Sequence, residues 1–284
     1  MDWMVYMLSD KEFEHIIKMI TQHTGIIPKN SHQESIRHYL EDQYKDQFEV
    51  PGFRLDSYIN DNPQEIESLI NAVTVNETYF FREEGQFKLL QEKIFPELRI
   101  IFPDSVNIWS AACSSGEEIY SLALLGQSAF LPAKYTASDI NTSMLEKCKK
   151  GLYGKNSVRR VDGSHYHYLL PRTDEEGRIS MPEDLKAKIN IQNINLSQLT
   201  NELNICLLPK NQHLIFIRNV FIYFSMEMRS KILKAIVDNS MAEGAYLFVS
   251  TNEIASLEPS ILPANLKKCS DGNVFYFKKE AKHE

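Results

Sequence analysis

The chain has 284 residues, of which 43% are hydrophobic and 24% charged, a balance typical of a soluble globular protein with one large domain or two smaller ones. It contains no run of about 18 apolar residues, and its acidic first residues lack the pattern of a signal peptide, so neither a membrane span nor an export signal is expected. Residues 1–70 hold 13 Asp and Glu against 6 Lys and Arg and so carry the whole net charge of −7, which disfavours nucleic-acid binding there.

The four cysteines, Cys113, Cys148, Cys206 and Cys269, show no paired spacing. A disulfide framework or a zinc site would be expected to show such spacing. We therefore expect free thiols, a location in the reducing cytoplasm and no bound metal.

Apolar residues at helical spacing predict three helices near the N-terminus. The first begins after Ser9-Asp10 and can end at Gly25, the second covers about residues 33–44, and the third begins at Asn62-Pro63 with proline in its first turn. These helices indicate a small all-α domain over residues 1–75, followed by a second domain over residues 76–284.

Residues 73–83, with the sequence VTVNETYFFRE, mix β-branched, aromatic and polar side chains without a helical or strand period. Asn76, Thr78 and Arg82 would converge on a ligand if this segment were extended and then turned. The alternative is a linker whose aromatic rings fill a core.

Residues 106–121 indicate a strand, a tight loop of small residues and then a helix. Small side chains let a ligand approach the loop backbone, and the helix start offers unpaired N–H groups. A dinucleotide loop would have three glycines, whereas this loop has only Gly116, followed by Glu117 and Glu118. Two carboxylates repel a diphosphate and suit a cationic or hydroxyl-bearing ligand, such as a sulfonium nucleoside. The alternative is an ordinary α/β turn whose acids stabilise the helix dipole.

Polar residues also follow the other predicted strands. One strand, over 134–139, ends in Asp139, about 20 residues beyond the loop, where an acid can hold ribose hydroxyls or else cap the next helix. Two more end in Asn195 and in Arg218-Asn219. Strands that alternate with helices form a parallel sheet, and ligands bind beyond the carboxyl ends of its strands. The pattern therefore predicts an α/β domain with a nucleoside-type ligand.

Residues 153–188 interrupt this rhythm with arginines, tyrosines, a turn signal and histidines at positions 165 and 167. We interpret them as an inserted, partly β, exposed subdomain. Alternate histidines are expected to mark one solvated strand face rather than a metal site.

Four stretches together resemble one family. They are Asn76–Arg82, Trp109–Glu118, Ala137–Ile140 and Arg218–Phe224. In this order and near this spacing they resemble the chemotaxis receptor methyltransferases, the CheR family of S-adenosylmethionine-dependent protein-glutamate O-methyltransferases. The resemblance implies a class I (Rossmann-like) methyltransferase sheet with an N-terminal all-α domain and a small inserted antiparallel β-subdomain, here about residues 154–188.

The resemblance also assigns roles by matching position. Arg82 and Tyr223 look like the residues at the reaction centre. The methyl donor would be S-adenosylmethionine, which leaves as S-adenosylhomocysteine, and no metal would be needed. Its contacts would come from Asn76, Thr78, Arg82, Glu118 and, less certainly, Glu117. Asp139 would hold the ribose, and the adenosine and methionine parts would be lined by Asn195, Leu196, Arg218 and Asn219.

The function implied is methyl transfer to glutamate side chains of chemotaxis receptors, giving methyl esters for sensory adaptation. The expected partner is the cytoplasmic helical domain of a receptor. The resemblance leaves open whether the β-subdomain binds a C-terminal receptor peptide, and it implies neither nucleic-acid binding nor membrane insertion.

Three departures from the family pattern stand out. Ile119 replaces the usual proline after the paired glutamates, and Ser250-Thr-Asn-Glu253 replaces the more usual Ser-Glu ending after its strand. The second helix, whose basic face meets acidic receptor helices in family members, here has Arg37 and Lys45 among four acids. We expect donor binding to be retained and substrate choice to differ.

Two other functions fit part of the pattern. A non-catalytic sensor or tether would bind S-adenosylmethionine and dock a partner, but Arg82 and Tyr223 argue against it. A nicotinamide-dependent oxidoreductase would need the missing glycines and would be repelled by the paired glutamates.

Overall fold

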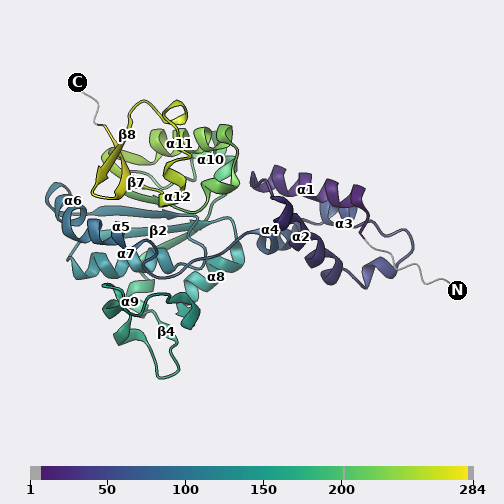
Figure 1. The fold of residues 1–284 in the computed structure, drawn as a ribbon, viewed down its shortest axis with the longest axis horizontal. Helices are drawn as coiled ribbons and strands as arrows, with labels where there is room; N and C mark the ends of the chain where they lie inside the picture. Colours follow the sequence, from purple (N-terminus) through teal and green to yellow (C-terminus); the bar gives the residue numbers. More distant parts are fainter. Residues whose placement is uncertain (1–7, 201, 281–284) are drawn as a thin grey trace. The chain divides into compact units, whose positions relative to one another are not determined.

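The computed structural model describes residues 8–200 and 202–280 (Figure 1). The chain forms two compact units. One comprises residues 1–75 with 223–225, and the other comprises residues 76–222 with 226–284. Each unit is described by itself. None of the helices within the described ranges has the length and apolar character needed to cross a membrane.

The first unit is helical. Ser9 caps its first helix by accepting a hydrogen bond from the Glu12 N–H, and Gly25, in the left-handed conformation at φ 70°, ends it. Its core is made of aliphatic side chains such as Ile16, Leu40 and Leu55. The helices are α1 (Asp10–Thr24), α2 (Asn30–Gln43), η1 (Gln47–Glu49), α3 (Leu55–Asp61) and α4 (Pro63–Val73), so α2 begins three residues earlier than the periodicity predicts.

Arg37 of α2 is engaged inside this unit. Its guanidinium donates to the Leu8 carbonyl at 2.9 Å and to the Asp10 carboxylate at 2.8 Å, and it lies 4.2 Å from the centre of the Phe13 ring. The exposed residues of α2 include Glu34, His38 and Asp42. Arg37 therefore fastens α1 to α2, and the exposed side of α2 is not basic.

The second unit is built on a seven-stranded sheet in the order β5-β2-β1-β6-β7-β9-β8. Its first five strands are parallel, and the β8–β9 hairpin adds two antiparallel strands. The strands are β1 (Val106–Ala111), β2 (Ala133–Asp139), β5 (Ile189–Asn193), β6 (Gln212–Ile217), β7 (Met241–Phe248), β8 (Leu266–Asp271) and β9 (Val274–Lys279). The strand order reverses between β1 and β6, which is where ligands bind in open α/β sheets.

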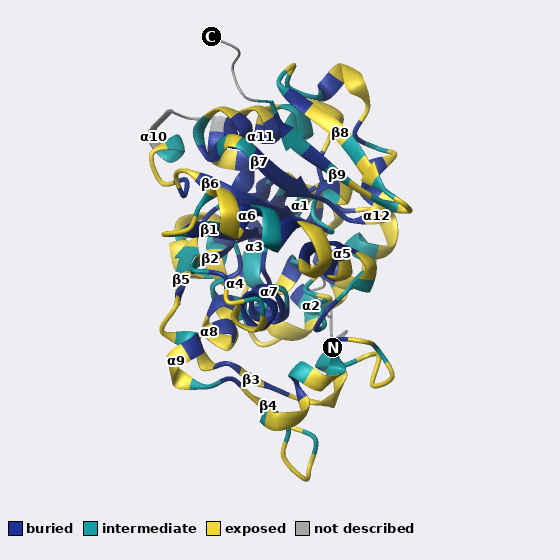
Figure 2. Ribbon diagram, turned by 90° about the vertical axis from the view of Figure 1, so that its left-hand side faces the viewer, coloured by how far each residue is buried: buried dark blue, intermediate teal, exposed yellow. Residues whose placement is uncertain are grey.

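Helices cover this sheet and supply much of its core. Trp109, Phe216 and Phe248 of the strands are fully buried, as is most of α7. In Figure 2 the central strands and α7 are coloured as buried. The helical segments are α5 (Glu84–Leu89), η2 (Leu90–Ile94), α6 (Phe95–Ile101), α7 (Glu117–Ser128), α8 (Thr142–Lys150), η6 (Leu196–Thr200), α10 (Glu202–Ile205), η7 (Phe221–Tyr223), α11 (Met226–Asn239), α12 (Thr251–Ile254) and η8 (Pro259–Ile261). The predicted class I architecture is confirmed.

The inserted segment holds little strand structure. Strands β3 (Leu152–Tyr153) and β4 (Ile179–Ser180) form a two-stranded antiparallel sheet. Short helical segments make up much of the rest of the segment, namely η3 (Lys155–Ser157), η4 (Tyr166–Tyr168), η5 (Leu170–Arg172) and α9 (Glu183–Lys186).

The predicted strand through the two histidines is therefore wrong. His165 directly precedes the 3-10 turn η4, and His167 lies within it. The His165 ring is buried against Phe81, with ring centres 5.0 Å apart. Its Nδ1 lies 3.2 Å from the Glu84 carboxylate. The alternation of polar and aromatic residues here resembles the pattern of a half-exposed strand. The His165 ring, however, is buried by packing on Phe81 and not by a neighbouring strand.

Asp56 is a buried acid of the helical unit, and its environment favours the charged form. Burial alone would raise its pKa, but hydrogen bonds from His15, Arg54 and the Ser57 N–H outweigh burial and leave the pKa lowered. Asp56 therefore stabilises the unit fully above the ordinary aspartate pKa of about 3.9, and this contribution is lost as the pH falls through the lowered folded-state value.

Replacing Asp56 with asparagine is expected to lower the free energy of unfolding of the helical unit by about 1–3 kcal/mol at pH 7, because the hydrogen-bond donors of His15, Arg54 and Ser57 lose their charged acceptor. Thermal unfolding followed by circular dichroism measures this. The difference from wild type should shrink as the pH falls below about 4. Asp42→Asn, on the exposed side of α2, is the matched control. Equal effects of the two substitutions would contradict the assignment.

Candidate active site

The loop after β1 brings its backbone close to neighbouring elements. Ala112 and Ser114 have positive φ angles of 61° and 50°, and Gly116 has φ 96°. A Cβ on Gly116 would lie 2.4 Å from the Cys148 sulfur, so only glycine fits. This close approach and the positive φ explain why position 116 requires glycine, while Ala112 and Ser114 adopt positive φ angles with a Cβ.

Asp139 fastens this loop to the end of β2. One carboxylate oxygen accepts the Ser114 N–H at 2.7 Å and the other accepts the Asn141 N–H at 2.9 Å. Burial raises the pKa of Asp139, and these backbone hydrogen bonds oppose that shift. The cap of α8 is Asn141, which accepts the Met144 N–H at 2.9 Å. The helix-cap interpretation of Asp139 is therefore wrong.

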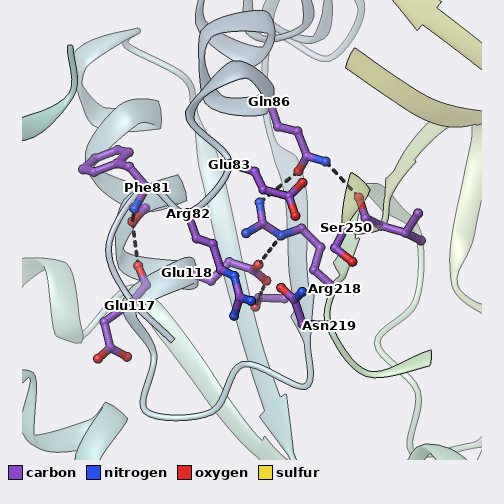
Figure 3. A network of polar contacts seen from close by, with 12 residues as sticks. Phe81, Arg82, Glu83, Gln86, Glu117, Glu118, Arg218, Asn219 and Ser250 are labelled. Carbon is purple, nitrogen blue, oxygen red and sulfur yellow. Dashed lines mark hydrogen bonds and ion pairs between the residues drawn. The ribbon is translucent and has the colours of Figure 1, made fainter. Parts of the chain in front are cut away.

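The paired glutamates point in different directions (Figure 3). Glu117 is 3% exposed, and its carboxylate accepts from Ser115 at 2.7 Å and from Ser157 at 2.8 Å. Glu118 accepts from Ser110 at 2.6 Å and lies 3.0 Å from the Arg218 Nε. Consecutive helical residues are about 100° apart around the axis, so Glu117 binds the start of the inserted segment while Glu118 faces the end of β6.

Arg218 and Glu118 form a buried ion pair. The Arg218 side chain is 2% exposed and that of Glu118 is 12% exposed. The Arg218 Nε–H has no aligned acceptor, so the contact is Coulombic rather than a directed hydrogen bond. Burial raises the pKa of Glu118, and the positive charge of Arg218 opposes that shift.

Gln86 of α5 supports this pair, and sequence reasoning missed it. Its side-chain oxygen accepts from Arg218 at 2.9 Å, and its nitrogen donates to the Val249 carbonyl at 2.8 Å. Gln86 is 3% exposed. A polar residue beside the buried Phe87 was the one available signal, because its partners lie far away in the sequence.

The segment before α5 fills part of the core, as one of the two interpretations given to it requires. Phe80 and Phe81 are buried, as a core-filling linker requires. Asn76 and Thr78 lie in the stretch without regular structure that precedes them, and both are partly exposed. The Asn76 carbonyl is 3.5 Å from the Ser114 hydroxyl.

Arg82 follows on this segment between two residues with positive φ angles, Phe81 at 54° and Glu83 at 62°. Its guanidinium donates to the Glu77 carbonyl at 2.7 Å and lies 5.4 Å from the centre of the Tyr79 ring. Figure 3 shows its side chain directed toward those of Glu118 and Asn219.

The remaining candidates follow other strands. Asn219 comes after β6 with φ 57°, and its N–H donates to Glu253 at 2.8 Å. After β5, the Asn195 side-chain oxygen accepts from the Ser197 N–H at 3.0 Å, and Leu196 is buried. Tyr223 ends η7 and belongs to the stretch 223–225 that groups with the helical unit. The structure thus brings Arg82, Glu118 and Arg218-Asn219 together.

Comparison with known proteins identifies the domain that holds this site. Residues 76–263 match the family described as CheR methyltransferase, SAM binding domain, where SAM is S-adenosylmethionine. The chain belongs to the CheR methyltransferase family. This match also removes the nicotinamide-dependent alternative.

Curated relatives match most of the chain. The chemotaxis protein methyltransferase of Vibrio anguillarum is 29% identical over 95% of this chain and 98% of its own length. That of Klebsiella aerogenes is 31% identical over 87% of this chain and 84% of its own length. Among solved structures, magnesium protoporphyrin IX methyltransferase from Synechocystis has 11% identity and a TM-score of 0.36, over 79% of this chain and 94% of its own. Membership of the CheR family therefore rests on sequence.

The departure at Ile119 has a simple structural consequence. Where the family resemblance leads one to expect proline, Ile119 lies in the first turn of α7 and is fully buried. Proline in a first helical turn lacks an N–H that would be unpaired there anyway. Isoleucine instead adds apolar burial, and α7 begins at Glu117 all the same.

Replacing Gln86 with leucine is expected to destabilise the second unit by about 1–3 kcal/mol, because the Arg218 guanidinium and the Val249 carbonyl lose buried partners. We also expect weaker binding of S-adenosylmethionine, measurable by calorimetry, because Arg218 loses one of its two anchors. Gln127→Leu, at an exposed position of α7, is the control. If Gln86→Leu unfolds and binds like the control, Gln86 does not support the ion pair.

Proposed function

We propose that the protein transfers a methyl group from S-adenosylmethionine to glutamate side chains in the cytoplasmic helical domain of chemotaxis receptors. The products are glutamate methyl esters and S-adenosylhomocysteine. The observation that carries this proposal is the convergence of Arg82, Glu118 and Asn219 at the switch point of the sheet, inside the domain that matches the CheR family. The relatives named chemotaxis protein methyltransferase support the receptor substrate.

Each candidate residue suits one part of the donor. S-adenosylmethionine carries a sulfonium and an ammonium group, and the Glu118 carboxylate suits these positive charges. Asp139 keeps lone pairs for ribose hydroxyls beside its two backbone hydrogen bonds. The remaining donor contacts are assigned to Asn76, Thr78, Asn195, Leu196, Arg218 and Asn219. We assign Glu117 to shaping the loop, since Ser115 and Ser157 already occupy its carboxylate.

The proposed reaction needs positioning more than acid–base chemistry. A free glutamate side chain has a pKa of about 4.3 and is ionised near neutral pH. The methyl group leaves an activated sulfonium, so one carboxylate oxygen forms the new bond while the sulfur takes the electron pair of the old one. Holding the oxygen, methyl carbon and sulfur in line can supply about 7–11 kcal/mol of barrier reduction. We propose that Arg82 anchors a carboxylate by a charge-assisted hydrogen bond.

The substrate is expected to differ from that of relatives that use a basic α2. Arg37 is bound to Leu8 and Asp10, whereas Lys45 is exposed and lies two residues beyond the end of α2. Alanine at Lys45 should therefore slow receptor methylation more directly than alanine at Arg37. The latter should first loosen α1 from α2.

Methyl transfer to a receptor cytoplasmic fragment tests the whole proposal. With methyl-labelled S-adenosylmethionine, the fragment should gain label that alkali releases as methanol, as expected of an ester. A fragment with glutamine in place of its methylated glutamates is the control and should gain none. A protein that binds the donor but labels no fragment would instead fit the sensor or tether. We infer a cytoplasmic location from the site of this substrate.

Replacing Tyr223 with phenylalanine is expected to lower kcat about tenfold or more with donor affinity unchanged, because a hydroxyl that orients the reacting groups acts in the transition state. Steady-state methylation with saturating donor and receptor fragment measures this kcat. Tyr276→Phe, on β9, is the control. Unchanged kcat in Tyr223→Phe would remove this tyrosine from the reaction.

A further inference from the structure

We propose that Glu253 is a positioning residue for donor binding and methyl transfer, which holds the turn after β6 in its active shape. The inference rests on the function proposed above, because the turn carries Asn219 and leads to Tyr223. Glu253 lies on α12, in the stretch where the sequence departs from the family pattern.

The Glu253 carboxylate is fully buried and bound by neutral donors. One oxygen accepts the Asn219 N–H at 2.8 Å, the Ser250 hydroxyl at 2.6 Å and the Ser250 N–H at 3.1 Å. The other accepts the Ile222 N–H at 3.4 Å. Glu253 is 0% exposed, and no Lys, Arg or His within the described ranges forms an ion pair with it. A buried carboxylate without a cation persists only where hydrogen bonds satisfy it.

Helix capping accounts for only half of these contacts. Ser250 and Glu253 form a capping box at the start of α12. The other two hydrogen bonds leave this helix and reach the backbone of a different segment, at Asn219 and Ile222. Because α12 has only four residues, we assign the main effect of the Glu253 carboxylate to the turn after β6, whose backbone it binds at Asn219 and Ile222.

The turn needs this support at its first residue. Asn219 has φ 57°, a left-handed conformation that costs free energy for any residue with a Cβ, although asparagine tolerates it better than most. Strained residues of this kind persist when their surroundings fix them. Glu253 fixes both ends of the turn, and the Asn219 side chain then points toward Glu118 and Arg82 (Figure 3).

The same short segment also holds the turn that carries Arg82. Glu83, with φ 62°, accepts the Thr251 N–H at 3.0 Å and the Thr251 hydroxyl at 2.9 Å. Residues 250–253 are therefore a common support for two loops of the site. A change at Glu253 should alter how Asn219 is presented while the Glu83–Thr251 contacts remain.

A double-mutant cycle tests the inference. Calorimetry with S-adenosylhomocysteine should give a dissociation constant about tenfold higher for Glu253→Gln than for wild type, because an amide cannot accept every bond that the carboxylate accepts. Glycine adopts φ 57° without penalty. The effect of Glu253→Gln should therefore shrink to about threefold or less in an Asn219→Gly background. Glu258→Gln, an exposed acid five residues away, should leave binding unchanged.

Equal effects of Glu253→Gln in both backgrounds, or no effect in wild type, would overturn the proposal. If Glu253→Gln does not fold, Glu253→Asp replaces it, since the shorter side chain keeps its charge but cannot reach both Asn219 and Ile222. Wild-type affinity in Glu253→Asp would equally overturn the proposal. Failure of the wild-type protein itself to bind S-adenosylhomocysteine would instead refute the proposed function.

Discussion

The buried ion pair between Arg218 and Glu118 is the constraint on which the rest of the site depends. Two charges removed from water are stable only if each compensates the other and further hydrogen bonds support them. Ser110 supplies a donor to Glu118, and Gln86 supplies an acceptor to Arg218. These four residues lie in β1, in α7, directly after β6 and in α5, so the ion pair fixes the relative positions of four elements at the switch point of the sheet.

Backbone strain is concentrated in the same place. Non-glycine residues with positive φ occur in the segment before α5, in the loop after β1 and in the turn after β6. In several cases a buried polar side chain from another element accepts a hydrogen bond from the backbone N–H of such a residue. The supports are Ser121 for the N–H of Phe81, Asp139 for that of Ser114, Glu253 for that of Asn219, and the contact of the Glu83 carboxylate with Thr251. Strain of this kind is stable only where the surroundings over-determine it, which is why buried polar side chains are numerous at this edge of the sheet.

The sequence predicts where this site lies better than it predicts the hydrogen bonds and ion pairs within the site. Strand periodicity and the rule of carboxyl ends place Glu118, Arg218 and Asn219 at one edge because both depend on local patterns. Gln86 and Glu253 escape such reasoning, since each acts through partners more than thirty residues away. The separation of Glu117 from Glu118 is local, but it depends on where α7 begins. The strand predicted at His165 is wrong because the burial of the His165 ring depends on its contact with Phe81, which lies far away in the sequence and leaves no periodic pattern.

Donor and acceptor recognition are under different physical constraints in this chain. Glu118, Arg218 and Asn219, three of the residues assigned to the donor, belong to a network of buried charges, a strained turn and hydrogen bonds, in which one substitution disturbs several partners. The exposed side of α2 has no such coupling, so a change of charge there is expected to leave the fold intact and to act on substrate steering, the role proposed for this helix. Arg37 illustrates the difference, because its positive charge is retained but is used to join two helices. An acidic α2 is therefore compatible with the proposed methyl-transfer site, and the proposal made above places the difference from other members of the CheR family in substrate choice rather than in chemistry.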